Sequence, residues 1–424
     1  MTKNPNGKIG ALLIGGAHGS LAVARSLGRH GIPVFYLTND HQITRFSRYT
    51  TMSATWAGPD RANAADDLLD LAKRHRLAGW VLFPGGDAEV QMVSQSREKL
   101  SSVFRVTTPD WDTIQWALDK RLTYQRAAAL GIDHPWSYYP RDHRDVAQLE
   151  CRFPVILKPT TRLQTNAFTL GKAWQAHDRS TLLSRYDEAA ALVGEQGIVL
   201  QEMIPGGGET QFSYAAVWHR GQPVASLVAR RARQYPIYIG YTSTMVQSIE
   251  CKEVEEAGSR FLHSLNYSGI AEVEFKYDSR DGRYKILDVN ARIWTWNSLG
   301  RIAGVDFPYV LWRLAMGEAV TPARGRAGAT WMHFSRDFVA ACQEIWVGRI
   351  SPADYFRSFR APLEFAEFTR DDPLPGIIDF PLLVLRLFTR RLPLLARGIK
   401  PFLVKSLSRL RDQFFAGHNS HKIP

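Results

Sequence analysis

The sequence has 424 residues, of which 45% are hydrophobic and 22% are charged. This composition is typical of a globular protein, and the length predicts two or three domains with cores that need no disulfide or metal staple. The cysteines, Cys151, Cys251 and Cys342, are far apart, which argues against a disulfide framework or a cysteine zinc site. Neither a signal peptide nor a membrane-spanning apolar run is evident, so a cytoplasmic location is expected.

Positive charge is concentrated towards the C-terminus. The net charge is +12 and the pI is near 9.6. Residues 381–424 contain nine Lys or Arg and one Asp, so this segment carries +8 of that charge. The charge therefore describes the partners of this segment more than the chemistry of the rest of the chain.

The first 112 residues alternate between strand-like and helix-like segments. Residues 8–14 predict a buried strand, and a glycine turn and a helical pattern follow it. Further strands are expected at 31–38 and 79–84, and further helices at 62–78 and 87–100. This alternation predicts a small doubly wound α/β domain.

Residues 113–318 follow a different pattern. Helices are expected at 113–131, 178–193 and 253–266, and long antiparallel hairpins at 211–231 and 269–292. Gly131 is a typical stop signal for the first of these helices. The pattern predicts an α+β domain, and residues 319–424 are expected to form a mainly helical extension.

The second hairpin carries an unusual set of polar side chains. Asp288 and Asn290 are two residues apart in one strand, so both point to the same face, and Glu274 lies on the opposing strand. Apolar neighbours indicate that the hairpin belongs to a packed sheet. Two carboxylates and an amide oxygen form the all-oxygen set that Mg²⁺ prefers. Arg292 continues the face and could stabilise charge on a transferring phosphoryl group.

This hairpin resembles a known family. AEVEF (271–275) and ILDVNAR (286–292) are similar to the metal-binding hairpin of ATP-grasp enzymes such as biotin carboxylase and D-alanine–D-alanine ligase. Other signatures follow the family's order, and the resemblance covers about residues 8–318. It implies a pre-ATP-grasp α/β domain at 1–112 and an ATP-grasp domain at 113–318 with two subdomains and a hinge near 201–205. The extension at 319–424 would follow.

The resemblance implies nucleotide contacts for five residues. Lys120 and Lys158 match the two lysines that contact the phosphates of ATP. The backbone of Glu202 and Ile204 would meet the adenine edge, and Glu209 would bind the ribose hydroxyls. Burying an unpaired ammonium is costly, which independently favours a functional partner for Lys158 in its apolar strand.

A basic residue also reaches the triphosphate in predicted carboligases of this superfamily, and the stretch RRARQYPIYIGYTS (230–243) resembles that segment. The match implies Arg231, although Arg230 and Arg233 compete with it. Lys172 is a further possible phosphate contact. Asp288 stands where the family more commonly has Glu.

The N-terminal domain offers weaker candidates. The turn GGAHGS does not match the dinucleotide-binding fingerprint, and such turns are common in α/β domains. The resemblance instead points to substrate contacts at the strand ends. His18 and Arg25 are candidates there, and so are Asp87 and Glu89.

The resemblance implies an ADP-forming carboxylate–amine ligase with ATP and Mg²⁺ as cofactors. Glu274, Asp288 and Asn290 would hold the metal, a substrate carboxylate would attack the γ-phosphorus, and an amine would displace phosphate from the resulting acylphosphate. Two alternatives remain at this stage. One is a non-ligating ATP-binding scaffold acting at a membrane surface, and the other is a nicotinamide-dependent oxidoreductase.

Residues 374–415 alternate apolar clusters with Arg and Lys, and prolines divide them into pieces too short to span a bilayer. These pieces could lie in a membrane interface with basic residues near anionic headgroups. They could equally pack on the body of the enzyme. Nucleic-acid binding is not expected, because no recognition motif accompanies the basic residues.

Overall fold

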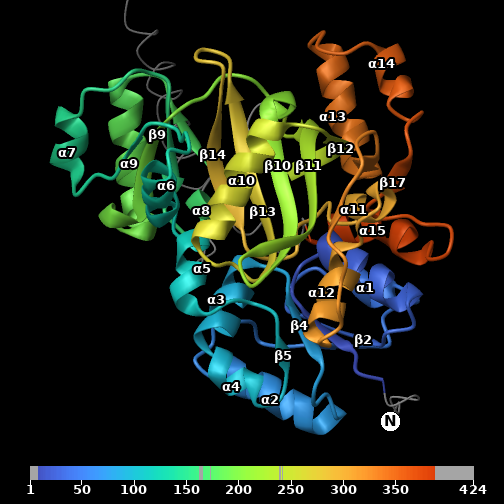
Figure 1. Cartoon of the computed structure of the whole chain (residues 1–424). Helices are drawn as coiled ribbons and strands as arrows, with labels where there is room; N and C mark the ends of the chain where they lie inside the picture. Colours follow the sequence, from blue (N-terminus) through green and yellow to red (C-terminus); the bar gives the residue numbers. More distant parts are fainter. Residues whose placement is uncertain (1–7, 162–165, 172, 238–239, 241, 387–424) are drawn as a thin grey trace, which may run out of the picture.

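The computed structural model describes residues 8–161, 166–171, 173–237, 240 and 242–386. Its described strands form three sheets (Figure 1). A parallel sheet lies at the N-terminal end of the molecule, a large mixed sheet lies at its centre, and a small antiparallel sheet lies beside the large one.

The N-terminal sheet is parallel throughout, with strand order β3-β2-β1-β4-β5. Its strands are β1 (Ala11–Ile14), β2 (Val34–Thr38), β3 (Met52–Thr55), β4 (Val81–Pro84) and β5 (Arg105–Val106). Ala11 and Leu13 pack towards α1 (His18–Arg29), whereas Leu12 and Ile14 pack towards α2 (Ala64–His75) and α3 (Asp87–Gln95). Because both faces are covered, the strands are apolar throughout, as the sequence indicated.

The large sheet has the order β14-β13-β10-β11-β12-β16-β17, with β15 paired to β11. Its strands are β10 (Gln211–His219), β11 (Gln222–Tyr235), β12 (Thr242–Ile249), β13 (Gly269–Asp278), β14 (Arg283–Asn290), β15 (Ala323–Arg324), β16 (Thr330–Met332) and β17 (Leu363–Phe365). The two predicted hairpins are present as β10–β11 and β13–β14. The segment after residue 318 also contributes strands, so this sheet continues past that boundary.

Helices cover the large sheet on both sides. They include α10 (Lys252–Ser264), α11 (Leu299–Ala303), α12 (Phe307–Ala315), α13 (Phe334–Trp346) and α14 (Pro352–Arg357). Phe261 and Leu262 of α10 are buried against Tyr214 and Val273 of the sheet. The amphipathic pattern of α10 explains why the sequence predicts this helix to within two residues.

The small sheet is antiparallel, with the order β6-β9-β7-β8. Its strands are β6 (Ser137–Tyr138), β7 (Val155–Pro159), β8 (Trp174–Ala176) and β9 (Ile198–Glu202), and its helices are α7 (His143–Gln148), α8 (Ala167–Gly171) and α9 (Arg179–Val193). Two single turns, η2 (Glu195–Gly197) and η3 (Gly208–Thr210), flank β9. Leu182 and Tyr186 of α9 pack on Val155 and Leu157, which gives this unit its own core.

The single helix predicted at 113–131 is wrong. The structure has two helices, α5 (Trp111–Leu118) and α6 (Lys120–Ala129), separated at Asp119. Asp119 has an extended backbone, and its side chain accepts a hydrogen bond from the backbone N–H of Arg121. An N-cap aspartate therefore restarts the helix and places Lys120 at its first position. Residues 87–100 are similarly divided into α3 and α4 (Arg97–Ser101).

The C-terminal part of the described chain returns to the N-terminal sheet. Helix α15 (Leu374–Arg386) lies close to η1 (Ile43–Phe46) and α1 (Figure 1). Arg25 is buried and donates to Asp372 over 2.9 Å and to the carbonyl oxygens of Ala366, Glu367 and Asp372. The suggested substrate contact of Arg25 is therefore wrong, because its guanidinium is engaged by this segment.

Within the described ranges, the structure contains no helix that combines the length and apolarity required to cross a bilayer. Only the start of the apolar-basic segment, up to residue 386, lies in those ranges. The prediction for residues 374–415 therefore falls mostly outside the residues that the structure describes.

Candidate active site

The predicted acidic hairpin is formed by β13 and β14. Glu274 lies directly opposite Asp288, and Glu272 lies opposite Asn290. The Asn290 amide nitrogen donates to Glu274 Oε1 over 2.8 Å and to Glu272 Oε2 over 3.0 Å. The structure thus brings Glu274, Asp288 and Asn290 to one face, as strand alternation implied.

Glu272 belongs to this face, although the sequence reasoning passed over it. Its carboxylate is buried and accepts hydrogen bonds from Ser213 over 2.9 Å and from the Trp296 indole over 3.1 Å. Burial, together with the neighbouring charge of Glu274, raises the pKa of Glu272 to about 7. The available signal was its spacing, because Glu272 precedes Glu274 by two residues in one strand.

Lys120 reaches the hairpin from the first turn of α6. Its ammonium donates to Asp288 Oδ1 over 3.0 Å, and its side chain is 5% exposed. An ammonium at this depth requires an anionic partner. The cap at Asp119 fixes the start of α6 and so determines where this lysine enters the site.

The structure separates the three neighbouring arginines of β11. Arg231 lies 3.6 Å from Glu274 Oε2. Arg233 forms a buried ion pair with Asp337 of α13, with a shortest distance of 2.7 Å, and Arg230 donates to Gln247 over 3.3 Å. Of the three, Arg231 is therefore the one placed against the acidic face.

Arg292 joins the hairpin to the N-terminal sheet. It donates to Asn290 Oδ1 over 2.9 Å and forms an ion pair with Asp87, the first residue of α3. Asp87 follows β4, at the carboxyl end of the parallel sheet, where open α/β sheets usually bind their ligands. This ion pair brings the two predicted sites together.

Glu89 lies at the same sheet end but is buried. Burial is the main cause that raises the pKa of its carboxyl to about 7. Gly15 adopts φ +68°, and a side chain there would overlap the Glu89 carboxylate. The glycine turn after β1 is therefore required by the close approach of Glu89.

Lys158 is held on the opposite side of the site. Its ammonium donates to Gln201 Oε1 over 2.8 Å, and the Gln201 amide donates to the Tyr124 hydroxyl over 2.9 Å. Tyr124 in turn donates to the carbonyl oxygen of Leu287, next to Asp288. A chain of hydrogen bonds thus connects Lys158 to the acidic hairpin.

The predicted hinge residues follow β9. The Glu202 N–H donates to the Trp136 carbonyl over 3.0 Å, and the Glu202 side chain pairs with Arg280 and Lys285 at the hairpin end. Its N–H is thus already used within the protein, and its carboxylate ties the small sheet to the large one. Ile204 is buried.

Glu209, the candidate for the ribose hydroxyls, lies in the turn η3. It is exposed, and its carboxylate accepts a hydrogen bond from the backbone N–H of Gly207 over 2.8 Å. A groove of about 660 Å³ opens beside the hinge and is lined by residues that include Trp136, Phe153 and Met203. Lys172 lies outside the residues that the structure describes.

Known proteins match this chain over the same region. Residues 237–322, which include the acidic hairpin, match the family described as carbamoyl-phosphate synthase L chain, ATP binding domain. A D-aspartate ligase from Enterococcus faecium (strain Aus0004) is 22% identical over 275 residues, or 61% of this chain. The chain spans 64% of the length of that relative.

Solved structures match over three quarters of the chain. The biotin carboxylase domain of Hydrogenobacter thermophilus 2-oxoglutarate carboxylase, in complex with MgADP, ADP and bicarbonate, has a TM-score of 0.61 and 16% identity, covering 76% of this chain and 73% of that one. An L-amino acid ligase from Bacillus licheniformis has a TM-score of 0.58 and 14% identity, covering 78% and 79%. The chain has the ATP-grasp fold. The predicted fold class is therefore confirmed.

Within this ATP-grasp fold, the predicted site residues fall into two groups. Six of them form one connected network of hydrogen bonds and ion pairs: Lys120, Arg231, Glu274, Asp288, Asn290 and Arg292. The others, Lys158, Glu202, Ile204 and Glu209, lie along β7 and the segment that follows β9. The roles assigned to both groups stay predictions.

Proposed function

We propose that this protein is an ATP-dependent ligase that activates a carboxylate as an acylphosphate for attack by an amine. The observation that carries the proposal is the network in which three cationic side chains, Lys120, Arg231 and Arg292, converge on the acidic face of the β13–β14 hairpin. The likeness to a D-aspartate ligase and to the fold of an L-amino acid ligase supports it.

The donor set of the hairpin fits a magnesium ion. Glu274 and Asp288 offer carboxylate oxygens and Asn290 offers an amide oxygen, and all three lie on one face. Hard Mg²⁺ selects such oxygen donors and leaves room for phosphate oxygens. When bound, the ion would neutralise charge on the terminal phosphates of ATP. Its presence would also offset the acidity that Lys120 and Arg231 now balance.

The cationic side chains would bind and orient the phosphates. Lys120 and Lys158 lie on opposite sides of the hairpin, linked through Gln201 and Tyr124. Arg231 contacts Glu274 at 3.6 Å, a distance that permits it to turn towards a phosphate. Phosphoryl transfer depends mainly on such positioning and electrostatic stabilisation.

The adenine would lie at the hinge. The Glu202 N–H is used by Trp136, so the proposed backbone contacts are the Glu202 carbonyl oxygen and the Ile204 N–H. The groove of about 660 Å³ beside the hinge has a size within the range of ligand sites in proteins. Glu209 is exposed near this segment and would face the ribose.

The reaction would proceed in two balanced steps. A carboxylate oxygen of the first substrate bonds to the γ-phosphorus, the bond from that phosphorus to the bridging oxygen breaks, and ADP leaves. The amine then attacks the acyl carbon, phosphate leaves, and the amine loses a proton. The protein supplies no covalent nucleophile. Arg292, fixed by Asp87, stands where it can stabilise the negative charge that develops.

The test is ADP release, measured across pairs of carboxylates and amines that include aspartate and other amino acids. We expect ADP formation that requires a carboxylate and an amide product that requires both substrates. Asn290→Ala should lack both signals. ADP formation that is independent of any carboxylate, or ATP binding without turnover across the screen, would instead favour an ATP-binding scaffold.

A second role at a membrane surface is favoured by one observation. The first turns of α15 expose Leu374, Ile377 and Phe380 and bury Asp379, so the apolar side of this helix faces outward. Exposed apolar side chains next to a basic segment are typical of interfacial helices. This role would locate the enzyme and would leave the proposed ligation unchanged.

A further inference from the structure

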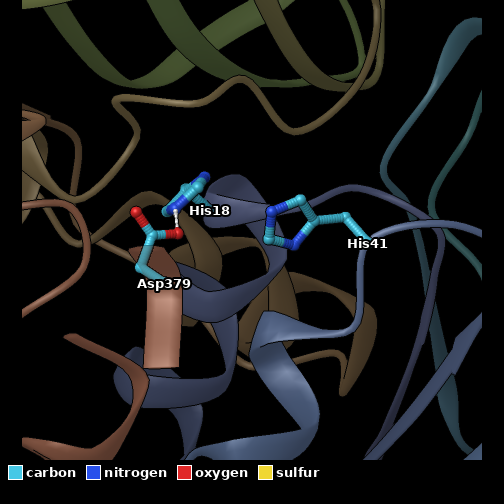
Figure 2. Close-up of side chains that lie close together, drawn as sticks. All are labelled: His18, His41 and Asp379. Atoms are coloured by element: carbon cyan, nitrogen blue, oxygen red, sulfur yellow. Dashed lines mark hydrogen bonds and ion pairs between the residues drawn. The ribbon is translucent and has the colours of Figure 1, made fainter. Parts of the chain in front are cut away.

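Five ionisable side chains are gathered in the interior between the N-terminal sheet and the C-terminal segment. This histidine cluster consists of His18, His41, His333, Glu367 and Asp379, and each member is at most 6% exposed. Figure 2 shows His18, His41 and Asp379 gathered at one point, with the dashed line joining His18 to Asp379. Such groups are rarely buried together unless they are paired or bind a metal.

The members come from segments that are distant in sequence. His18 begins α1, just after β1, and His41 follows β2, so both lie at the carboxyl edge of the parallel sheet. His333 follows β16, Glu367 follows β17, and Asp379 lies on α15. The fold therefore assembles the cluster from its first 41 residues and its last described 54.

The distances suit shared coordination. The ligand atoms of His18, His41 and Asp379 all lie within 4.8 Å of one another, and so do those of His333, Glu367 and Asp379. Asp379 is common to both groups. Its Oδ1 is 2.8 Å from His18 Nε2, and its Oδ2 is 3.8 Å from His333 Nε2.

The 3.8 Å separation is informative. It is too long for a hydrogen bond. Two atoms bound to one zinc ion at about 2.0–2.1 Å can be up to about 4.2 Å apart, so this spacing fits two ligands of the same ion. The ring centroids of His18 and His333 are 4.4 Å apart and those of His18 and His41 are 5.3 Å apart, which places the three imidazoles around one point.

Two buried polar atoms of the cluster lack a hydrogen bond. Among the described residues, no hydrogen-bond partner reaches His333 Nε2 or Glu367 Oε2. The other nitrogen of His333, Nδ1, lies 3.3 Å from the Ser335 hydroxyl and 3.5 Å from Glu367 Oε1. Metal-binding histidines typically hold their second nitrogen in this way, which orients the first one.

The charge around the cluster also favours a cation. Glu367 and Asp379 are both acidic, and burial lowers the pKa of His18 to about 4, so that its imidazole is neutral near pH 7 and can donate a lone pair. The nearby Arg25 is already balanced by Asp372. Arg336 is the other cation that faces the group.

We propose that the histidine cluster binds a zinc ion, with His18, His41, His333 and Asp379 as ligands and Glu367 orienting His333. Imidazole and carboxylate donors suit zinc, and burial of every ligand is typical of a closed structural site. The site is distinct from the all-oxygen hairpin. It would fasten α15 to the N-terminal sheet, and it does not depend on the proposed ligase activity.

The test is the metal content of the full-length protein, purified without a polyhistidine tag or chelator and measured by elemental mass spectrometry. We expect about one equivalent of zinc per chain in the wild type. His41→Gln and Asp379→Asn should lose it. His30→Gln, which changes a half-exposed histidine at the end of α1, should retain it, and so should Asn290→Ala in the hairpin.

A second measurement covers variants that fail to fold. Wild-type protein is dialysed against a chelator and titrated with cobalt, whose visible absorption reports nitrogen and oxygen ligands. We expect saturation at one equivalent and a higher melting temperature on adding zinc. Wild type that holds no metal and takes up neither cobalt nor zinc would overturn the proposal, and so would a His41→Gln variant with the full zinc content.

Discussion

The ammonium of Lys120 and the carboxylate of Asp288 form a 3.0 Å ion pair in a site where each has a different predicted partner. The lysine is predicted to contact phosphate and the aspartate is predicted to bind Mg²⁺. Because a buried charge needs compensation, the two residues compensate each other in the structure. Binding of Mg-ATP would replace one contact by two, and each residue would keep an opposite charge beside it.

Removing Lys120 should therefore affect ATP more than folding. Lys120→Met keeps the length of the side chain but removes a charge-assisted contact, which is worth roughly 1.5–3 kcal/mol. We expect ATP affinity, measured by calorimetry with Mg²⁺, to fall on the order of 10- to 100-fold. Lys99→Met, at an exposed site in α4, serves as the control. Unchanged affinity for ATP in Lys120→Met would return this lysine to a structural role.

The hairpin acids should be essential for turnover. Glu274→Gln removes one predicted metal ligand charge, and Asn290→Ala removes both the amide oxygen and the hydrogen bonds to Glu272 and Glu274. We expect ATP turnover to fall at least about 100-fold in each, with little change in the circular dichroism spectrum. Asp281→Asn, at the exposed end of the same hairpin, should retain activity. Normal turnover in either site variant would contradict the metal assignment.

Local patterns predicted the hairpin because strand alternation depends only on neighbouring residues. Long-range partners could not be predicted in this way. Arg25 and Asp372 are 347 residues apart, and His18 and Asp379 are 361 apart, so no local pattern links them. The break at Asp119 was also missed, because an N-cap inside a helical pattern competes with the periodicity that surrounds it.

The competition among the arginines of β11 was another limit of the sequence. Alternation cannot separate Arg231 from Arg233, which are two residues apart, and an irregularity in the pairing with β12 falls between them. The structure places Arg233 against Asp337 instead of the hairpin. Only the packing of α13, distant in sequence, decides this difference.

These two arginines should respond differently to mutation. Arg233→Ala leaves the buried carboxylate of Asp337 unpaired, which typically costs about 3–5 kcal/mol, so its melting temperature should fall by several degrees. Arg231→Ala should retain most of its stability and lose ATP turnover. The paired measurements are thermal unfolding and ADP release. A stable Arg233→Ala together with a fully active Arg231→Ala would reverse the assignment.

Glu89 should make stability depend on pH. Its folded pKa of about 7 lies above the ordinary value of 4.5, so the folded state binds the proton more tightly than the unfolded state. Its contribution is therefore fully present below about pH 4.5 and is lost as the pH rises to about 7. Glu89→Gln should stabilise the protein at pH 8 relative to pH 5, by roughly 2–3 kcal/mol at most.

The measurement for Glu89 is chemical denaturation of wild type and variant at both pH values. Comparing the two differences removes the pH-independent cost of the substitution. Glu98→Gln, at an exposed position in α4, should show no such change with pH. A Glu89→Gln effect that is equal at pH 5 and pH 8 would show that the carboxyl is not protonated in the folded protein.

The boundary for truncating the C-terminal segment follows from its contacts. A chain that ends at residue 370 would lose Asp371, Asp372 and Asp379, which pair with Arg29, Arg25 and His18. Arg25 would then be buried without a counter-ion, and we expect this truncation to unfold or aggregate. A chain that ends at residue 386 keeps all three pairs and should fold.

The truncation at residue 386 therefore separates membrane binding from folding. It removes residues 387–424, which carry eight Lys or Arg. Basic residues near an anionic surface contribute about 1 kcal/mol each, so their loss should greatly reduce sedimentation with anionic liposomes at low salt. Phe380→Ser in the full chain should weaken binding further through lost apolar contact, because its ring is 64% exposed on α15. If the full chain fails to sediment with these liposomes while the truncated chain retains full ATP turnover, the membrane role is wrong and the ligase proposal stands.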